Sequence, residues 1–327
     1  MLGDLVERRT LHFTDLTVSR LCLGTMTFGG QCDEAASRLV IERGLDAGIN
    51  FLDTANVYGK GRSEEILGRA LGTRRKDVVL ASKVRGVMGD GPDDSGLSRP
   101  AMRKAIEASL RRLHTDYLDL YYLHQPDDSV PIEETLETME ELVREGKVRY
   151  PASSNYASWQ VCRMLCLAES RGWRPAGVTQ PMYNLLARGI EQEYLPMARE
   201  MKVSTVVYNP LAGGLLTGKH GRDQPVAGSR FDANDMYRRR YWHEAMHEAV
   251  EELRSAARQA GRSLISLSLN WLLHHSPADC IILGASRAEQ LAENLKACEE
   301  GPLPADTVAR CDAVWEKLRG VVPRYNR

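Results

Sequence analysis

The sequence predicts an α/β protein whose strands and helices close into a (β/α)8 TIM barrel. Eight short apolar runs alternate with helical patterns along the chain. This alternation gives repeated βαβ units, whose parallel strands close most simply into a barrel. The runs 78–80 and 205–207 are continuously apolar, as is typical of strands covered on both faces. The 327 residues contain no linker, so we expect a single barrel domain over residues 1–327.

The strands and helices are expected in a regular order. The eight strands are expected at 21–24, 50–53, 78–83, 117–124, 148–154, 178–181, 203–208 and 280–283. The helices between the first seven strands are expected at 34–47, 63–71, 99–113, 132–145, 158–171 and 190–201. In this fold the active site lies at the carboxyl ends of the strands. The residues that end these strands are therefore the first candidates for chemistry.

Additional segments flank this alternation. Residues 10–19 are short, polar and alternating, with Thr14-Asp15 as a turn, which predicts a small β-hairpin over one end of the barrel. A long loop follows the seventh strand and is Gly-rich over 211–228. Loops of this length inside a compact domain are usually functional lids. Extra helices are expected at 244–261, 265–274, 287–297 and 302–318, followed by a tail at 320–327.

Composition excludes several classes of function. The 43 Lys and Arg residues balance 44 Asp and Glu residues without any basic block, so a nucleic-acid partner is not expected. The N-terminus lacks a signal-peptide core, and no run of about 18 apolar residues occurs, so we expect a soluble cytoplasmic protein without membrane contact. Seven scattered Cys residues without a CxxC favour free thiols. Composition does not decide between a monomer and a homo-oligomer.

Four polar residues stand at or just beyond the ends of three successive strands. Asp53, Lys83 and His124 end the second, third and fourth strands, so they should meet at one mouth of the barrel. Tyr58 follows in a loop whose two glycines allow its phenol to fold back over this mouth. Singly, such residues are more often structural. Together they form a cluster that would be costly to bury without a purpose.

The chemistry of this quartet is that of a carbonyl reductase. A phenol with a pKa near 10 needs about 4 kcal/mol to drop three units, and a unit charge at roughly 4 Å supplies about that much at an effective dielectric constant of about 20. Lys83 is therefore expected to lower the pKa of Tyr58, which would protonate a carbonyl oxygen as the general acid. Asp53 would keep Lys83 charged, and His124 would hydrogen-bond the substrate oxygen.

The loops after the seventh and eighth strands offer a site for a hydride donor. Tyr208 precedes a Gly-containing loop, where an aromatic ring can stack on a flat heterocycle and the backbone can approach closely. Residues 284–287 open the helix after the eighth strand, and these two loops are the usual phosphate site of the barrel. Lys219, Arg230 and Arg287 would add charge for a 2′-phosphate. NADP(H) is therefore favoured over NAD(H) as the cofactor.

Eight stretches together carry a family resemblance, among them FLDTANVYG and YNPLAGG. In order and spacing they lie at 23–26, 51–59, 81–83, 123–126, 154–156, 180–184, 208–214 and 284–286. With them the chain resembles the aldo-keto reductases over essentially its full length, in the branch of aflatoxin aldehyde reductases and potassium-channel beta subunits. The resemblance implies NADP(H)-dependent reduction of an aldehyde or ketone to an alcohol by hydride transfer from nicotinamide C4. It implies a catalytic tetrad of Asp53, Tyr58, Lys83 and His124, with Tyr58 as the general acid.

The resemblance also implies where the cofactor and the substrate bind. The nicotinamide would be held by Ser154, Asn155 and Gln180 and would stack on Tyr208, with the dinucleotide under the loop 211–219. The implied cofactor residues are Gly24, Thr25, Met26, Asp53, Ser154, Asn155, Gln180, Tyr208, Asn209, Pro210, Leu211, Ala212, Gly213, Lys219, Arg230, Gly284, Ser286, Gln290 and Asn294. The expected substrate pocket consists of Phe28, Val57, Tyr58, His124 and Tyr156. Aryl aldehydes, dicarbonyls and nucleotide-linked keto sugars all stay open as substrates.

One stretch departs from the family pattern. Relatives usually have an apolar residue, Gly and another apolar residue before Ser-Asn on the fifth strand, whereas this chain has Pro151-Ala152-Ser153. A proline removes a hydrogen-bond donor from a strand that should be central and parallel. We therefore expect the fifth strand to start late or to bulge, which would move Ser154 and Asn155.

Three alternatives belong to other classes of protein. His243-Glu244-Ala245-Met246-His247 is an HExxH sequence, which on a helix would place two imidazoles toward zinc with Glu244 as the base of a hydrolase. No Glu or Asp between 263 and 278 offers a third ligand, so no metal is expected. Residues 213–219 read GxxxxGK but continue with His220, so the Mg²⁺ ligand of a P-loop is missing. The third alternative is a dinucleotide-sensing regulatory subunit with slow turnover.

Overall fold

Eight parallel strands close into a barrel in the computed structural model, which describes residues 7–323 and 326. The order around the barrel is β10, β3, β4, β5, β6, β7, β8 and β9, so the last strand pairs with the first. The strands are β3 (Leu21–Gly24), β4 (Phe51–Asp53), β5 (Val79–Val84), β6 (Leu118–Leu123), β7 (Val148–Ser154), β8 (Val178–Gln180), β9 (Ser204–Val207) and β10 (Cys280–Gly284). The predicted TIM barrel is confirmed.

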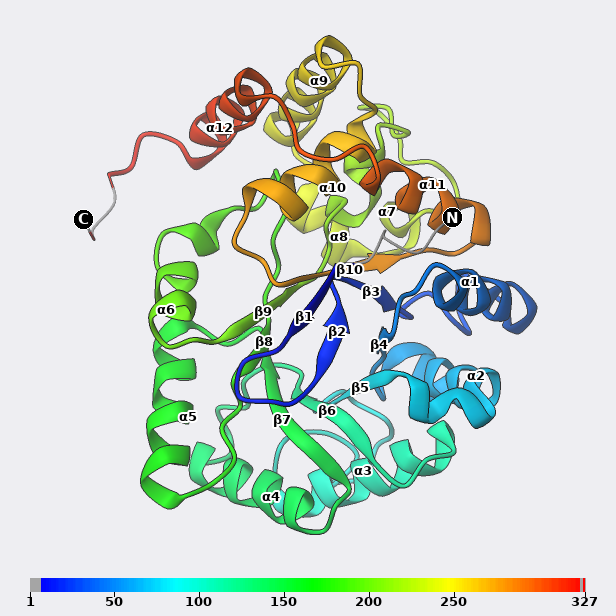
Figure 1. Cartoon of the computed structure of the whole chain (residues 1–327), viewed down its shortest axis with the longest axis vertical. Coiled ribbons are helices and arrows are strands. Elements are labelled where there is room, and N and C mark those ends of the chain that lie inside the picture. Colours follow the sequence, from blue (N-terminus) through cyan, green and yellow to red (C-terminus); the bar gives the residue numbers. More distant parts are fainter. Residues whose placement is uncertain (1–6, 324–325, 327) are drawn as a thin grey trace.

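Helices surround the barrel, as Figure 1 shows. The six that connect the first seven strands are α1 (Glu34–Asp46), α2 (Arg62–Leu71), α3 (Arg99–Leu113), α4 (Ile132–Arg144), α5 (Ser158–Arg171) and α6 (Tyr194–Glu200). Short 3-10 turns are η1 (Tyr58–Gly61), η2 (Gly72–Asp77), η3 (Gly189–Glu191) and η4 (Ala212–Thr217). The predicted start of the sixth helix at 190 is wrong. Because α6 begins at Tyr194, Pro196 lies in the first turn, where its missing N–H costs no helical hydrogen bond.

The predicted N-terminal hairpin is present and closes one end of the barrel. β1 (Arg8–Thr10) pairs antiparallel with β2 (Thr17–Ser19), and the two strands cross the barrel end in Figure 1. Leu11, Leu16 and Val18 are buried in one cluster with residues of the barrel interior. The hairpin therefore fills this end of the barrel with apolar side chains.

The predicted disturbance of the fifth strand at Pro151 is wrong. β7 runs from Val148 to Ser154, and Pro151 pairs with Tyr121 of β6 in register. The pairing of β7 with β8 begins only at Ala152. Pro151 therefore lies beside one paired strand rather than two, so its missing N–H does not interrupt a second ladder. Ser154 keeps its register opposite Gln180.

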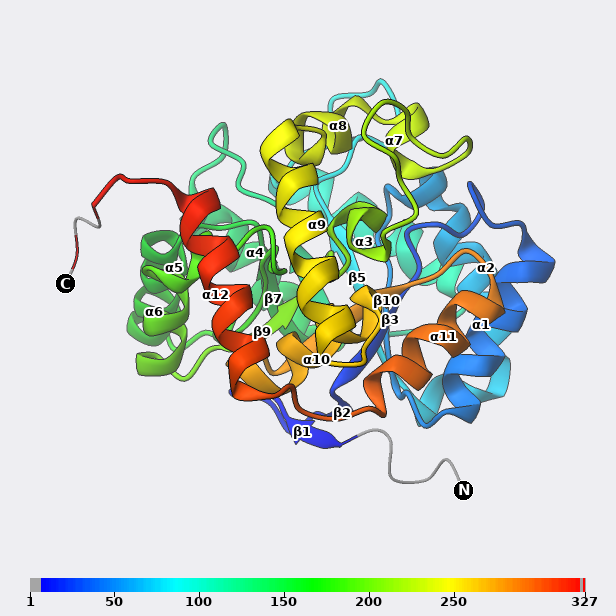
Figure 2. The same cartoon turned by 90° about the horizontal axis from the view of Figure 1, so that it is seen from above.

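The long segment after β9 contains more helix than the sequence predicts. Between η4 and the expected helix at 244–261, the chain forms α7 (Arg230–Ala233) and α8 (Asp235–Tyr241), neither of which was expected. Figure 2 shows α7 and α8 at the end of the barrel opposite the hairpin. The later helices are α9 (Glu244–Gln259), α10 (Leu264–His275), α11 (Ala288–Cys298) and α12 (Ala305–Arg319). α12 packs along α9 in both views.

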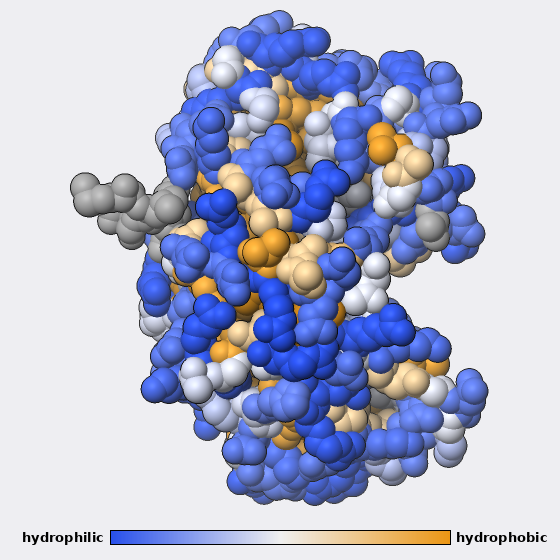
Figure 3. All heavy atoms as spheres, turned by 90° about the vertical axis from the view of Figure 1, so that its right-hand side faces the viewer, coloured by the Kyte–Doolittle hydropathy of each residue, from blue (hydrophilic) through white to orange (hydrophobic). Residues whose placement is uncertain are grey.

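The face of the molecule drawn in Figure 3 is largely polar. Figure 3 shows a mostly hydrophilic face with apolar atoms in small separate groups. No helix among residues 7–323 is long and apolar enough to cross a membrane.

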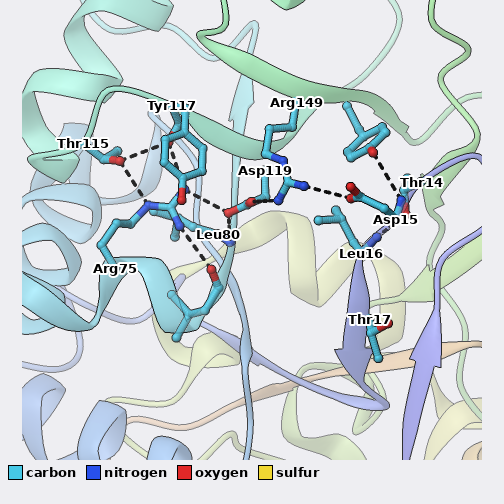
Figure 4. Close-up of polar contacts among 12 residues, drawn as sticks. Thr14, Asp15, Leu16, Thr17, Arg75, Leu80, Thr115, Tyr117, Asp119 and Arg149 are labelled. Atoms are coloured by element: carbon cyan, nitrogen blue, oxygen red, sulfur yellow. Dashed lines mark hydrogen bonds and ion pairs between the residues drawn. The ribbon is translucent and has the colours of Figure 1, made fainter.

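A buried carboxylate ties the hairpin end of the barrel together. Asp119 of β6 lies between Arg75 and Arg149, each 2.9 Å away, as Figure 4 shows. The backbone N–H of Leu80 donates to the same carboxylate at 2.9 Å. Arg149 also pairs with Asp15 in the hairpin loop at 2.8 Å. One buried anion thus connects β5, β6, β7 and the hairpin.

Replacing Asp119 by Asn should destabilise the fold. The substitution leaves the buried guanidinium of Arg75 without its anion, which should lower the free energy of unfolding by about 3 kcal/mol. Urea denaturation checks this value. Asp15→Asn is the matched control, because it removes only the exposed end of the network and should cost about 0.5 kcal/mol or less. Equal losses in the two variants would contradict a central role of Asp119.

Candidate active site

The four residues Asp53, Tyr58, Lys83 and His124 come together at the barrel end opposite the hairpin. Lys83 is fully buried, and its Nζ forms an ion pair with Asp53 Oδ1. Nζ also donates to the carbonyl oxygen of Thr54 at 2.8 Å and lies 5.0 Å from the centroid of the Tyr58 ring. The Tyr58 and His124 rings are 5.9 Å apart, edge to face at 80°. The sequence-based placement of these residues at one mouth agrees with this geometry.

The backbone after Tyr58 explains how the phenol reaches the mouth. Gly59, Lys60 and Gly61 have φ values of 56°, 53° and 94°, all in the left-handed region. Glycine adopts this region without strain, and Lys60 is the one residue of the three with a steric cost. At Gly61 a Cβ atom would lie 2.8 Å from Cδ of Arg112. A side chain there would have to displace Arg112 and would adopt a strained left-handed backbone, so glycine suits this turn of the loop.

Burial, rather than Lys83, dominates the titration of Tyr58. Burial raises the pKa of the phenol above its ordinary value, the charge of Lys83 lowers it, and Asp53 raises it again. The net direction is upward, so the sequence-based expectation of a lowered pKa is wrong, although the charge of Lys83 acts in the predicted direction. Desolvation of the phenolate raises the pKa, and the charge of Lys83 opposes it only weakly, because Asp53 neutralises that charge. The phenol consequently keeps its proton, which is the form a general acid needs.

Lys83 stays charged although it is buried. Burial alone would lower the pKa of its ammonium, but Asp53 and Tyr58 raise it above its ordinary value. Asp53 is itself held on its second oxygen, because Nε2 of Gln180 donates to Oδ2 at 2.8 Å. The carboxylate thus has two donors on two oxygens and a fixed orientation.

His124 is neutral. Burial, followed by the charges of Lys83 and Arg85, lowers the pKa of its imidazole to about 3. A neutral imidazole carries one N–H donor and one acceptor nitrogen. At ordinary pH, His124 can therefore offer a hydrogen bond to a substrate oxygen without adding a charge beside Lys83.

A chain of hydrogen bonds continues from the quartet along the ends of the next strands. Ser154 Oγ donates to the carbonyl oxygen of Gln180 at 2.8 Å. Nδ2 of Asn155 donates to the carbonyl oxygen of His124 at 2.8 Å, with φ of Asn155 at 62°. The Tyr208 hydroxyl donates to Asn155 Oδ1 at 2.7 Å. The residues assigned to a nicotinamide by resemblance are therefore one connected polar wall beside Lys83.

Three cations gather at the loops after β9 and β10. Burial, followed by the charges of Arg287 and Arg230, lowers the pKa of Lys219. The guanidinium of Arg230 would lie 3.4 Å from a Cβ atom at Gly284, just before Arg287 at the start of α11. Among residues 7–323 none of the three cations forms an ion pair with a carboxylate. Such mutually repelling cations fit a phosphate group.

Nearby, Gln290 folds back onto the loop that begins this helix. Its Oε1 accepts hydrogen bonds from Ser286 N at 2.9 Å and Ser286 Oγ at 3.0 Å. Asn294 lies one turn further along α11 and is buried. Gln290 therefore fixes the loop just before Arg287, and Asn294 follows on the same helix.

Some predicted contact residues lie beneath the mouth instead of on its surface. Phe28 is fully buried, so it offers no surface to a substrate. Thr25 is also fully buried, with its hydroxyl donating to the carbonyl oxygen of Asp53 at 3.1 Å. A Cβ atom at Gly24 would lie 2.5 Å from Ile282, so this glycine permits close strand packing. In contrast, Met26 is exposed.

The HExxH sequence does not form a zinc site. His243 precedes the first turn of α9 with extended backbone, and its Nε2 lies 2.8 Å from the carbonyl oxygen of Arg239. His247 instead packs edge-on against Trp242, with ring centroids 4.7 Å apart. No group of three or more His, Cys, Asp or Glu side chains within the described ranges could hold a metal ion.

Tyr241 is a residue of the mouth that the sequence did not single out. Its hydroxyl accepts hydrogen bonds from Nδ2 of Asn184 at 3.0 Å and Nδ2 of Asn209 at 2.8 Å. It therefore ties α8 to the loops after β8 and β9. The partners are far apart in the chain, so no local pattern identifies this tyrosine. A local feature that indicates the helix α8, though not the role of Tyr241, is Asn234, whose side chain caps the start of α8.

Comparisons with known proteins agree with this arrangement. Residues 20–316 match the model of the "Aldo/keto reductase family". The chain is 39% identical over 323 residues to rat aflatoxin B1 aldehyde reductase member 2, with 93% of this chain and 87% of the relative covered. It is 39% identical over 305 residues to the uncharacterized oxidoreductase YrpG of Bacillus subtilis, covering 90% and 91%. It is also 34% identical over 318 residues to a probable voltage-gated potassium channel subunit beta of Oryza sativa subsp. japonica, covering 94% and 96%.

The neutrality of His124 predicts a specific loss of stability at low pH. Between its folded pKa of about 3 and its ordinary value of 6.5, the unfolded chain binds a proton that the folded chain does not. The contribution of His124 to stability is therefore complete above about pH 6.5 and decreases as the pH falls. At pH 5 the decrease should be about 2 kcal/mol.

Urea denaturation of the wild type and His124→Gln at pH 7.5 and pH 5 checks this prediction. The wild type should lose about 2 kcal/mol more between the two pH values than the variant loses. The other histidines are common to both proteins and cancel in the comparison. An equal loss in the two proteins would show that His124 is protonated in the fold.

Proposed function

The chain belongs to the aldo/keto reductase family, and on this basis we propose that it reduces aldehydes or ketones to alcohols with NADPH. The single observation that carries the proposal is the buried ion pair of Lys83 with Asp53, placed beside the Tyr58 phenol and a neutral His124. This arrangement supplies a proton to an oxygen in a site from which water is largely removed. Bound NADPH would supply the hydride to the carbonyl carbon.

Tyr58 is the proposed general acid. Its O–H bond breaks as a new O–H bond forms on the substrate oxygen, which balances the hydride added to the carbon. The phenolate left on Tyr58 would face the Lys83 ammonium, whose charge stabilises it in a low-dielectric setting. His124 would donate its N–H to the same substrate oxygen and so position it toward the phenol.

The proposed cofactor site combines a polar wall with a cation cluster. Ser154, Asn155 and Gln180 offer amide and hydroxyl groups to a carboxamide, and Tyr208 offers an aromatic ring to a flat heterocycle. Lys219, Arg230 and Arg287 are arranged to bind a 2′-phosphate, which supports NADP(H) over NAD(H). The polar wall and the cation cluster therefore offer hydrogen-bond donors and positive charge that suit the carboxamide and the phosphate of the cofactor.

A regulatory subunit with slow turnover is the second candidate function. It is supported by the similarity to a rice protein named as a potassium channel subunit beta. The complete set of Asp53, Tyr58, Lys83 and His124 around one mouth favours catalysis instead. Aryl aldehydes and dicarbonyls are the substrates proposed first, since several relatives are named as aflatoxin B1 aldehyde reductases.

Tyr58→Phe should abolish reduction without loss of cofactor binding. Removing the phenolic oxygen removes the proton donor, so kcat should fall about 10²–10⁴-fold. NADPH oxidation in the presence of a panel of aldehydes and ketones measures the rate, and fluorescence titration measures the dissociation constant of NADPH. Retained turnover would reject Tyr58 as the acid. A wild type that reduces nothing in the panel but binds NADPH tightly would favour the regulatory subunit.

Lys219→Met should weaken NADPH binding selectively. The variant loses one of three charges proposed for the 2′-phosphate, so the dissociation constant of NADPH should rise about tenfold and that of NADH about twofold or less. Calorimetry with both dinucleotides makes the comparison. Lys296→Met is the control, because Lys296 is exposed at the opposite end of α11. If both dinucleotides weaken equally, Lys219 does not select the 2′-phosphate.

A further inference from the structure

Two cysteines lie one turn apart on the outer side of α5. This helix lies between α4 and α6 on the outside of the barrel, as Figure 1 shows. Cys166 is exposed and Cys162 is half-buried. The apolar residues of the same helix, such as Val161 and Leu165, are buried in the core. Both thiols are therefore open to reagents in solution.

The remaining thiols are inaccessible in the folded chain. The structure describes all seven cysteines, and none of them forms a disulfide. The buried ones are Cys22, Cys32, Cys280, Cys298 and Cys311. Reactivity of a thiol requires access as well as chemistry. A reagent specific for thiols should therefore reach only the pair on α5 while the fold is intact.

Helix geometry brings the two thiols together. Residues four apart lie on one face of a helix, with Cβ atoms about 5–6 Å apart. Helical side chains lean toward the N-terminus, so the sulfur of Cys166 points back over the turn that carries Cys162. The two groups interact, because burial raises the pKa of the Cys162 thiol and the charge of Cys166 raises it further. The more exposed Cys166 is therefore expected to react first, with Cys162 close enough to complete a ring.

A direct disulfide between the two cysteines does not fit this spacing. Disulfide-bonded cysteines have Cβ atoms about 3.5–4.5 Å apart, so an S–S bond would require the helical turn to distort. The helix α5 is held by its contacts with α4 and α6 as well as by its own hydrogen bonds. A single atom between the two sulfurs removes this mismatch, because it lengthens the bridge without moving the backbone.

The surroundings offer no set of ligands for a metal ion. The nearby carboxylate of Glu193 accepts a hydrogen bond from Ser158 Oγ. No group of three or more His, Cys, Asp or Glu side chains in the described part of the chain could hold a metal ion. Structural zinc sites use about four ligands. The bridging atom must therefore be one that needs only two sulfurs from the protein.

We propose that Cys162 and Cys166 together bind trivalent arsenic compounds that carry one organic substituent. Carbon occupies one bond of the arsenic, and the two sulfurs occupy the others. When such a compound reacts as its oxide, two S–H bonds break, two S–As bonds form, and both protons leave with the oxide oxygen as water. Arsenic stays trivalent, so no oxidant or reductant takes part. The site lies outside the barrel, so the inference goes beyond the proposed reductase function and does not depend on it.

The test adds phenylarsine oxide in equimolar amount to the folded protein. Intact-protein mass spectrometry should show a single adduct, and titration with Ellman's reagent should show that both accessible thiols have disappeared. The adduct should survive an excess of mercaptoethanol and be removed by ethanedithiol, because only a dithiol competes as a chelate. Cys166→Ser leaves a single thiol, so its dissociation constant for the arsenical should rise at least about tenfold.

Two double variants test the spacing of the thiols. Cys162→Ser with Ser170→Cys again places two thiols four residues apart, at positions 166 and 170 on the exposed side of α5, and should restore the stable adduct. Cys162→Ser with Trp159→Cys is the matched control, because Trp159 is 61% exposed. Its two thiols stand seven residues apart, about 10 Å along the helix axis, and should give only adducts that mercaptoethanol removes.

The inference is overturned if mercaptoethanol releases the arsenical equally from the wild type and Cys166→Ser. It is also overturned if the control with seven-residue spacing holds the arsenical as tightly as the wild type. None of these measurements requires turnover or a bound cofactor, so failure of the proposed reductase function would not affect their outcome.

Discussion

The buried ion pair between Lys83 and Asp53 is the interaction on which the rest of the site depends. An ammonium inside a barrel is tolerated only with a close anion and further acceptors, because desolvation alone would neutralise it. The register of the sheet supplies that anion, since Asp53 pairs with Ala81 and so comes beside Lys83 on the next strand. Gln180, from the opposite side of the barrel, holds the second carboxylate oxygen. Closure of the barrel therefore keeps Lys83 charged, and the position of this ammonium determines where proton transfer can be stabilised.

This pair also explains why Tyr58 is better described as a protonated acid than as a phenol with a lowered pKa. The charge of Lys83 lowers the pKa of the phenol, but the nearby charge of Asp53 raises it, and burial favours the neutral form. The positive charge becomes effective as the proton leaves, when a phenolate would otherwise stand in a poorly solvated site. His124 follows the same logic, because burial and two cations keep it neutral next to Lys83.

The sequence predicted the strands and all four central side chains, and one rule links three of the four. Asp53, Lys83 and His124 end successive strands, and parallel strands place such residues together. The effect of Pro151 could not be foreseen, because it depends on where the neighbouring strand begins to pair. Tyr241 and the helices α7 and α8 depend on contacts between distant segments. The direction of the Tyr58 pKa required a balance of burial against charge, and burial cannot be read from residue types.

The positive charges at the mouth of the barrel are confined to a few side chains. The chain as a whole carries a formal net charge of −1, so no general attraction for anions exists. Lys219, Arg230 and Arg287 gather beyond β9 and β10, while Arg85 follows β5 on the far side of the barrel mouth. Between them the charge of Lys83 is cancelled by Asp53. The proposed dinucleotide phosphate would therefore bind at one side of the mouth, away from a reacting centre whose charge is balanced by the Lys83–Asp53 pair.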